Sequence, residues 1–338
     1  FYKYPLQAYH PHGTMHYFGD GGGYFNGFTQ HHSEYFVYRT GNPFLYKYIR
    51  PYWESGKGDF WGYLWFRDDV IPKSRDILPS SKSFEAQGIV MRSGWEDSAS
   101  VISARIGPHS NHYHFDQGSF QIFTNGEPLL TDPSYGAGGY YANLDFNVYN
   151  IHAIAHNVML VDHDAESQTP ADSDTGIAAH RNWPRMTHSF TSEISDAVEA
   201  DLTSVYKDKL SSYTRTLLYT KTGPVFLMDE VKSNSAEGHV YDWLFHAPVN
   251  SIQYDNHRMT VDRPLARLTL DVISPEILDH SIRHNEADHE SFITLSSDEN
   301  LTNTKFLAVL FPEAKPTGTS FGPLPTTTKI NALSLIHI

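Results

Sequence analysis

The spacing of apolar residues changes near residue 80, and the change predicts two kinds of structure. Before it, apolar positions recur with a helical period and many are aromatic. Asn42 and Pro43 form a helix start, a capping side chain followed by proline at the first helical position, and residues 44–49 continue as an apolar stripe. A second helix is expected over 59–66, and the prolines and serines between 70 and 84 predict a linker.

From residue 88 onward the pattern is typical of β-strands. Short runs rich in β-branched and aromatic residues are separated by turn signals, among which Asn125-Gly126 is a strong hairpin signal. Strands are expected over 88–95, 98–106, 118–124, 127–132, 156–162, 213–221, 225–232, 240–246, 266–273, 291–295 and 305–312. Many short strands of this kind predict an antiparallel sandwich of about 250 residues.

Composition narrows the classes of partner. A chain of 338 residues can bury a large core. Its net charge of −14, from 25 Lys and Arg against 39 Asp and Glu, argues against nucleic acid and anionic membranes as partners, but it does not exclude an anionic substrate. No apolar run reaches the length of a membrane span. The chain has no Cys, which excludes disulfides and thiolate zinc sites, and nothing in it indicates an oligomeric state.

The candidate chemistry is concentrated between residues 109 and 118. His112, His114 and Asp116 share one face if this segment is extended. They could simply be surface or hydrogen-bonded residues in a chain with 20 His. As a functional set, His114 and Asp116 with a distant His would form the iron site of a non-haem oxygenase. Alternatively, one His binds zinc while its neighbour transfers protons.

Several motifs, in their order along the chain, resemble those of the heparinase II/III-like polysaccharide lyases. An upstream segment, Gly88-Ile-Val-Met-Arg92-Ser-Gly-Trp95, is similar to the first strand of that family's sandwich, and residues 12–21 are similar to a glycine-rich turn late in its helical toroid. The motifs that carry the resemblance are His112-Tyr-His114-Phe-Asp116-Gln-Gly-Ser-Phe, Asn125-Gly-Glu-Pro-Leu-Leu-Thr-Asp132-Pro, Ala155-His156-Asn157, Arg215-Thr-Leu-Leu, Val225-Phe-Leu-Met-Asp229-Glu and Trp243-Leu-Phe-His246.

The resemblance implies an α+β multidomain architecture. Residues 1–79 would be the last helices of an incomplete (α/α) toroid, 84–331 a large antiparallel β-sandwich, and the abrupt ending 332–338 a non-native tail. Zinc would be held in the sandwich by His114, Asp132 and His156, and His112 matches the catalytic His of the sandwich. The family's catalytic Tyr belongs to helices expected to precede this chain. Tyr24 is the candidate within it, although few residues separate Tyr24 from the sandwich.

The activity implied by the resemblance is β-elimination on a uronate-containing polysaccharide, such as alginate or a glycosaminoglycan, by a periplasmic or secreted enzyme. His112 would take the C5 proton or neutralise the adjacent carboxylate, and a structural zinc would hold the loops that orient it. Arg92, Arg105 and Tyr135 are candidate substrate contacts, as is Arg181, although a salt bridge is the simpler interpretation of each arginine. An epimerase that abstracts the same proton and a non-catalytic carbohydrate-binding sandwich remain alternatives.

The Asn-Gly hairpin sets a geometric condition on the zinc ligands. A two-residue turn there places Asp132 opposite Ser119, which is about 16 Å along the strand from His114 and on the other face. A shared metal therefore requires the strand to break, and Gly118 is the expected place. In that arrangement His114 is a zinc ligand. Asp116 is then either a turn residue or a carboxylate that hydrogen-bonds to and supports the zinc ligands.

Overall fold

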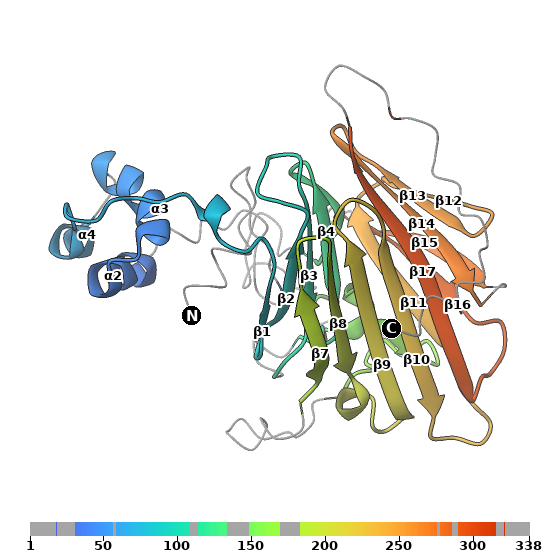
Figure 1. The fold of residues 1–338 in the computed structure, drawn as a ribbon. Coiled ribbons are helices and arrows are strands. Elements are labelled where there is room, and N and C mark those ends of the chain that lie inside the picture. Colours follow the sequence, from blue (N-terminus) through green and yellow to red (C-terminus); the bar gives the residue numbers. More distant parts are fainter. Residues whose placement is uncertain are drawn as a thin grey trace.

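Antiparallel strands form two packed layers, with a small group of helices beside them (Figure 1). The computed structural model describes residue 18 and residues 31–56, 59–108, 114–133, 149–169, 183–275, 278–285, 290–315 and 321. The strands are β1 (Lys82–Phe84), β2 (Gly88–Arg92), β3 (Ser100–Arg105), β4 (Phe120–Thr124), β5 (Glu127–Leu130), β6 (Met159–Val161), β7 (Arg185–Thr191), β8 (Ser195–Asp201), β9 (Leu210–Thr220), β10 (Val225–Ser233), β11 (Tyr241–Pro248), β12 (Ile252–Asp255), β13 (Arg258–Asp262), β14 (Ala266–Ser274), β15 (Asp279–Asn285), β16 (Glu290–Ser296) and β17 (Asn303–Ala314).

The eight-stranded sheet, with strand order β12-β13-β14-β17-β10-β9-β8-β7, makes one layer. The second layer combines a five-stranded sheet, β1-β2-β3-β4-β5, with a four-stranded sheet, β15-β16-β11-β6. These two sheets meet where the backbone N–H of Thr131, just after β5, donates to the carbonyl of His246 in β11 at 2.9 Å. One apolar core contains residues from all three sheets, so the predicted antiparallel sandwich is confirmed.

Burial along the strands shows which of them have one covered face and which have two. In β8, β9 and β10 buried residues alternate with partly exposed ones, because only one face of the eight-stranded sheet meets the core. Strand β11 is buried on both faces. Its outer face packs on a second apolar cluster that includes Val158, Leu160, Leu244 and Phe292. This cluster holds the segment around residues 153–161 against β11.

Among the described residues, three α-helices precede the sandwich: α2 (His31–Thr40), α3 (Pro43–Glu54) and α4 (Phe60–Trp65). The predicted helix start is confirmed, since the Asn42 side chain accepts hydrogen bonds from the N–H groups of Phe44 and Leu45. Asp59 caps α4 in the same way. The helices share a small core of their own, and none in the described part of the chain is long and apolar enough to cross a membrane.

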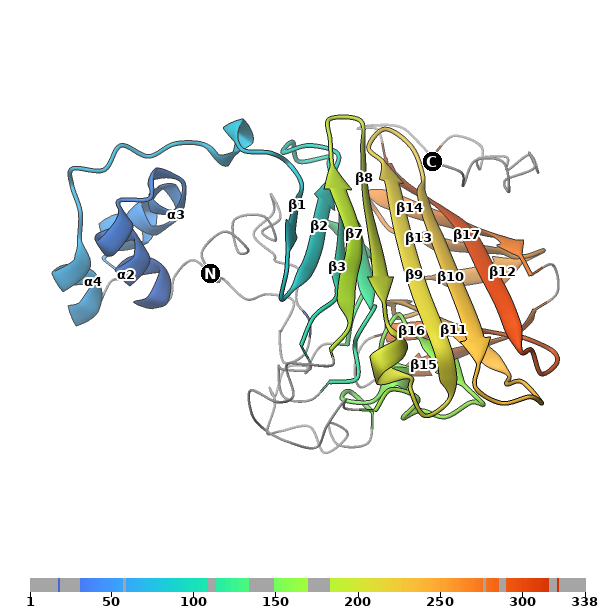
Figure 2. The same ribbon diagram turned by 60° about the horizontal axis from the view of Figure 1, so that its bottom comes forward.

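An extended segment with one short 3-10 helix, η1 (Arg75–Ile77), connects the helices to β1 (Figure 2). The Arg75 guanidinium lies over the rings of Tyr48 in α3 and Trp95 in the β2–β3 turn, 5.7 and 4.7 Å from their centroids. The indole N–H of Trp95 donates to the carbonyl of Leu78 at 2.9 Å. These contacts attach the connecting segment to the helices and to the sandwich.

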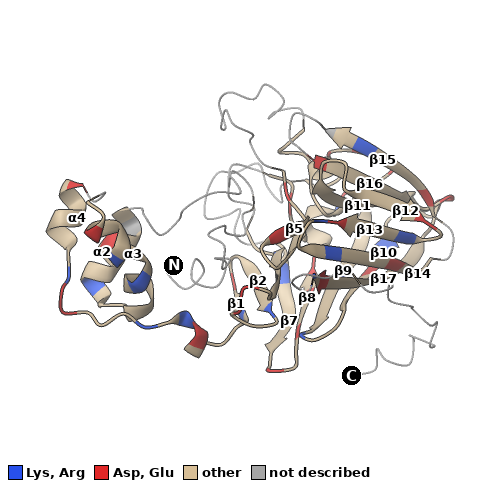
Figure 3. Ribbon diagram, turned by 90° about the horizontal axis from the view of Figure 1, so that it is seen from above, with Lys and Arg blue, Asp and Glu red and all other residues tan. Residues whose placement is uncertain are grey.

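Acidic and basic residues are interspersed over the strands and helices (Figure 3).

The β4–β5 hairpin has the predicted turn and a departure from the predicted register. Asn125 and Gly126 both have positive φ, 52° and 74°, as a tight two-residue hairpin requires. The expected pairing holds next to the turn, but a bulge shifts it so that Ile122 pairs with Leu130. Gly118 has φ 84° and lies in a turn two residues before β4 begins. The prediction that the strand breaks at Gly118 is therefore confirmed.

The toroid and the tail stay predictions. The glycine-rich segment 12–21 and residues 332–338 lie outside the described residues, apart from Phe18.

Candidate functional site

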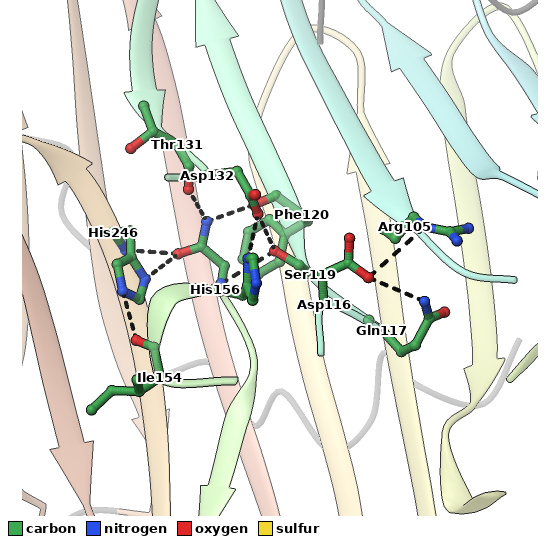
Figure 4. A network of polar contacts seen from close by, with 12 residues as sticks. Arg105, Asp116, Gln117, Ser119, Phe120, Thr131, Asp132, Ile154, His156 and His246 are labelled. Atoms are coloured by element: carbon green, nitrogen blue, oxygen red, sulfur yellow. Dashed lines mark hydrogen bonds and ion pairs between the residues drawn. The ribbon is translucent and has the colours of Figure 1, made fainter. Parts of the chain in front are cut away.

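Three of the predicted ligands lie together in the interior. His114 precedes β4, Asp132 follows β5, and His156 directly follows the 3-10 helix η4 (Ala153–Ala155). Their exposures are 1%, 2% and 0%. Nδ1 of His156 is 3.1 Å from Oδ2 of Asp132 (Figure 4). The ring centroids of His114 and His156 are 5.5 Å apart. The structure thus brings together His114, Asp132 and His156, which the sequence spreads over more than forty positions.

Ser119 links the strands that carry this cluster. Its hydroxyl donates to Oδ2 of Asp132 at 3.2 Å, so the two side chains meet although the bulge has displaced the predicted pairing register. The same hydroxyl oxygen accepts from the backbone N–H of Asn157 at 3.2 Å. The turn at Gly118 then redirects the chain, so that His114 reaches the neighbourhood of His156 rather than continuing along the strand.

The charges of the cluster are coupled. Burial acts to lower the pKa of His156, but the Asp132 carboxylate and, further off, Asp116 outweigh it, and the pKa is raised. Burial raises the pKa of Asp116, against the opposing charges of Arg105 and His156. One oxygen of Asp116 accepts from the Gln117 amide at 3.1 Å and lies 3.9 Å from Nε of Arg105. Asp116 therefore ties down the chain between His114 and Gly118.

The donor types of this cluster fit zinc, which favours imidazole and carboxylate ligands. Nε2 of His156 is buried and has no hydrogen-bond partner in the described chain, so this nitrogen is available as a metal ligand. The three donors are spaced more widely than a bound ion would hold them. In the described chain, the group whose donor atoms all lie within 4.8 Å of one another is instead His31, Glu34 and Asp59.

That second group is explained by hydrogen bonding among the helices. Nδ1 of His31 is 3.2 Å from Glu34, and its Nε2 is 3.4 Å from Asp59, the cap of α4. The other oxygen of Glu34 accepts from the indole N–H of Trp53 at 2.6 Å. These contacts tie α2 to α3 and α4 without an ion.

Asn157, which the sequence motif included only as a neighbour of His156, is the structural centre of the site. Its amide nitrogen donates to the carbonyls of Phe120 and Thr131, each at 2.7 Å. Its amide oxygen accepts from the backbone N–H of His246 at 2.7 Å. One fully buried side chain therefore joins β4, the end of β5 and β11. A single Asn after a His gives no sequence signal of such a role.

Two of the predicted substrate arginines, Arg92 and Arg105, are buried. Arg92 lies in β2 with its guanidinium 4.8 Å from the Trp95 ring centroid, and burial, helped by the charge of Arg75, lowers the pKa of Arg92 to about 9. Arg105 donates to the carbonyl of Pro108 and faces Asp116. Both side chains hold the protein together, so a substrate contact for either stays a prediction that these contacts do not support.

The remaining site predictions cannot be located. The predicted residues that lie outside the described residues are His112, Tyr24, Tyr135 and Arg181. Their roles stay predictions.

Comparison with known proteins identifies the class. The family model "Heparinase II/III-like, C-terminal" matches residues 76–314, which is most of the chain, and the chain belongs to this family. No curated protein matches the chain by sequence.

Solved structures share the fold. A heparinase III, the BT4657 gene product with methylated lysines, matches with a TM-score of 0.65 and 16% identity over 92% of this chain and 45% of its own. Heparan sulfate lyase HepC from Pedobacter heparinus matches with a TM-score of 0.67 and 15% identity over 92% and 45%. Another heparinase III gives 0.65 and 14% over 94% and 48%. The chain thus spans about half the length of these proteins.

Proposed function

We propose that this chain provides the sandwich of a polysaccharide lyase that cleaves a uronate-containing polysaccharide by β-elimination. The observation that carries the proposal is the convergence of the buried residues His114, Asp132 and His156, in a chain of the heparinase II/III-like family. The solved neighbours are named heparinase III and heparan sulfate lyase, which makes a heparan sulfate-type glycosaminoglycan the first substrate to test and alginate the next.

The reaction needs a base, an acid and neutralisation of the uronate carboxylate. In our proposal His112 takes the proton from C5, and the electrons of the C5–H bond form the C4–C5 double bond as the C4–O4 bond breaks. An acid, for which a Tyr is the candidate, protonates the departing O4. A hydrogen-bond donor or cation at the carboxylate stabilises the charge that builds up during proton removal.

The buried cluster would support the proposed catalytic residue, since His114 follows His112 by two positions in the sequence. We propose that His114, Asp132 and His156 hold a structural zinc, whose charge would fix the three segments relative to one another. In this arrangement Ser119 and Asn157 keep Asp132 and His156 in place from behind. The acidic polysaccharide is the only partner this chemistry requires, and an exported, periplasmic or secreted enzyme is the expected setting.

The test is product analysis on a substrate panel. The full gene product is incubated with heparan sulfate, heparin, chondroitin, dermatan, alginate and ulvan, and unsaturated uronate is followed by its near-ultraviolet absorbance. Activity on one substrate that His112→Ala abolishes and His188→Ala retains would support the proposal. His188 is a suitable control because it is an exposed histidine of β7 whose ring is paired with Glu199 of β8.

Other outcomes point to the alternatives. Exchange of the C5 hydrogen with deuterated solvent without chain cleavage would indicate an epimerase. Bound iron together with oxygen consumption would indicate an oxygenase that uses His114 and Asp116 and would end the lyase proposal. Saturable binding without either reaction would leave a carbohydrate-binding sandwich.

A further inference from the structure

A buried ion pair crosses the sandwich directly behind the site. Arg215 in β9 binds Asp229 in β10 with two hydrogen bonds, from Nε at 2.8 Å and from Nη2 at 2.7 Å. The indole N–H of Trp243 in β11 donates to the same carboxylate at 3.0 Å. Because the carboxylate binds two nitrogens along one edge of the planar guanidinium, the plane and direction of the Arg215 head group are fixed.

The remaining edge of the guanidinium faces the site segments. Nη1 of Arg215 donates to the carbonyls of Gly118 and Asn157, each at 2.8 Å. Gly118 ends the segment that carries His114, and Asn157 follows His156. Arg215 belongs to the eight-stranded layer, whereas the two carbonyls belong to the opposite layer. One nitrogen therefore sets where the two ligand-bearing segments meet.

The contact with Gly118 leaves little room for another arrangement. Gly118 holds a positive φ of 84°, and a Cβ built there would lie 2.5 Å from Cδ1 of Leu202. The turn is thus pressed against Leu202 on one side and held by Arg215 through its carbonyl. We infer that Arg215, fixed by Asp229 and Trp243, is a positioning residue that sets the separation of His114 and His156.

The chain contains a matched control for the loss of a buried ion pair. The side chains of Lys221 and Asp196 are 6% and 0% exposed, against 4% and 0% for Arg215 and Asp229. Lys221 also donates to the hydroxyl of Ser80 at 3.0 Å. Neither Lys221 nor Asp196 has a described contact with the segments of His114 or His156, so disrupting their pair should cost stability without moving the site.

The first readout is hydrogen exchange at a temperature well below unfolding. Arg215→Lys keeps a positive charge for Asp229, but its shorter reach and single nitrogen cannot bind both carboxylate oxygens and also place a separate donor on the two carbonyls. We expect faster exchange in 114–120 and 153–158 for this variant, with β9 and β10 still protected, and no such change in Lys221→Met. Exchange that rises evenly over the whole sandwich, or is unchanged in the two segments, would overturn the inference. Trp243→Phe, which removes one hydrogen bond from Asp229 and no charge, gives the same comparison if Arg215→Lys does not fold.

The second readout rests on the proposed zinc and is the affinity for zinc, measured by competition with a chelator. Loss of a group that orients ligands costs about 10- to 100-fold in metal affinity. Arg215→Lys should show a loss of this size and Lys221→Met should not, whereas wild-type affinity in Arg215→Lys would contradict the positioning role. If the wild-type protein takes up no zinc, the zinc assignment fails, and hydrogen exchange alone decides the role of Arg215.

Discussion

Replacing Asn157 tests whether one side chain holds the site together. Its amide binds three backbone groups, the buried carbonyl of Phe120, the part-buried carbonyl of Thr131 and the buried N–H of His246, each at 2.7 Å. Asn157→Ala leaves all three without this partner, and the residues of two of them, Phe120 and His246, are fully buried. Asn157→Asp keeps the shape of the side chain but turns a carboxylate oxygen toward the two carbonyls, so it should be at least as harmful.

The expected loss can be estimated group by group. A buried backbone group left without a hydrogen bond costs about 1–3 kcal/mol. Three such groups that relax together should cost about 3–5 kcal/mol in total, since effects at neighbouring groups do not add fully. That is a large part of the roughly 5–15 kcal/mol by which a domain is stable. Asn234 serves as the control, because its amide makes one hydrogen bond, 2.8 Å to the carbonyl of Asp208, at an exposed position.

Guanidinium unfolding followed by tryptophan fluorescence measures the difference. The midpoint should fall strongly for both Asn157 variants with an unchanged slope, and Asn234→Ala should lose less than about 1 kcal/mol. An Asn157→Ala protein that loses no more than Asn234→Ala would refute the hydrogen-bond account of the site. So would an Asn157→Asp protein that is clearly more stable than Asn157→Ala.

Three further predictions concern pH, backbone and metal. Burial lowers the pKa of His246 to about 3 from its ordinary 6.5, so the contribution of the neutral imidazole to stability is complete above pH 6.5 and is lost as the pH falls from 6.5 toward 3. His246→Gln should therefore weaken the fall in melting temperature over this acid range. The same fall in both proteins would contradict the prediction. Gly118→Ala should lower the free energy of unfolding by about 1–3 kcal/mol from strain plus the cost of moving Leu202, and by more than Gly56→Ala, where φ is also positive, 71°, but nothing lies within 4 Å. Chelation should lower the melting temperature of the wild-type protein but not of His156→Gln, and equal shifts would place any metal elsewhere.

Local patterns predicted most of the strands and two of the helices. The runs that became β9, β10, β11, β14 and β17 are long and apolar, and the Asn42 cap and the Asn-Gly turn act over a few residues. Strands β1, β7, β8, β12, β13 and β15 were missed. Strand β7 is largely exposed and polar, and the alternate buried positions of β8 are Asp196, Val198 and Ala200, only one of which is a large apolar residue, so neither strand has a strong apolar signal.

The candidate site divides in the same way. The resemblance to the family pointed to His114, Asp132 and His156, and the period of a strand predicted the break at Gly118. The sequence could not predict the bulge opposite Ile122 or the central position of Asn157, because each depends on which strands lie side by side in the folded layers.

By itself the sequence determined the antiparallel sandwich, its family and the identity of the residues with metal-binding chemistry. Tertiary structure alone decided how these residues meet. In the sequence, Arg215 and Asp229 give no sign of a special role. Only the packing of one layer on the other directs the guanidinium of Arg215 toward the carbonyls of Gly118 and Asn157. The reason is physical: burying an ion pair is stabilising only when every donor finds an acceptor, and those acceptors come from segments that the sequence leaves far apart.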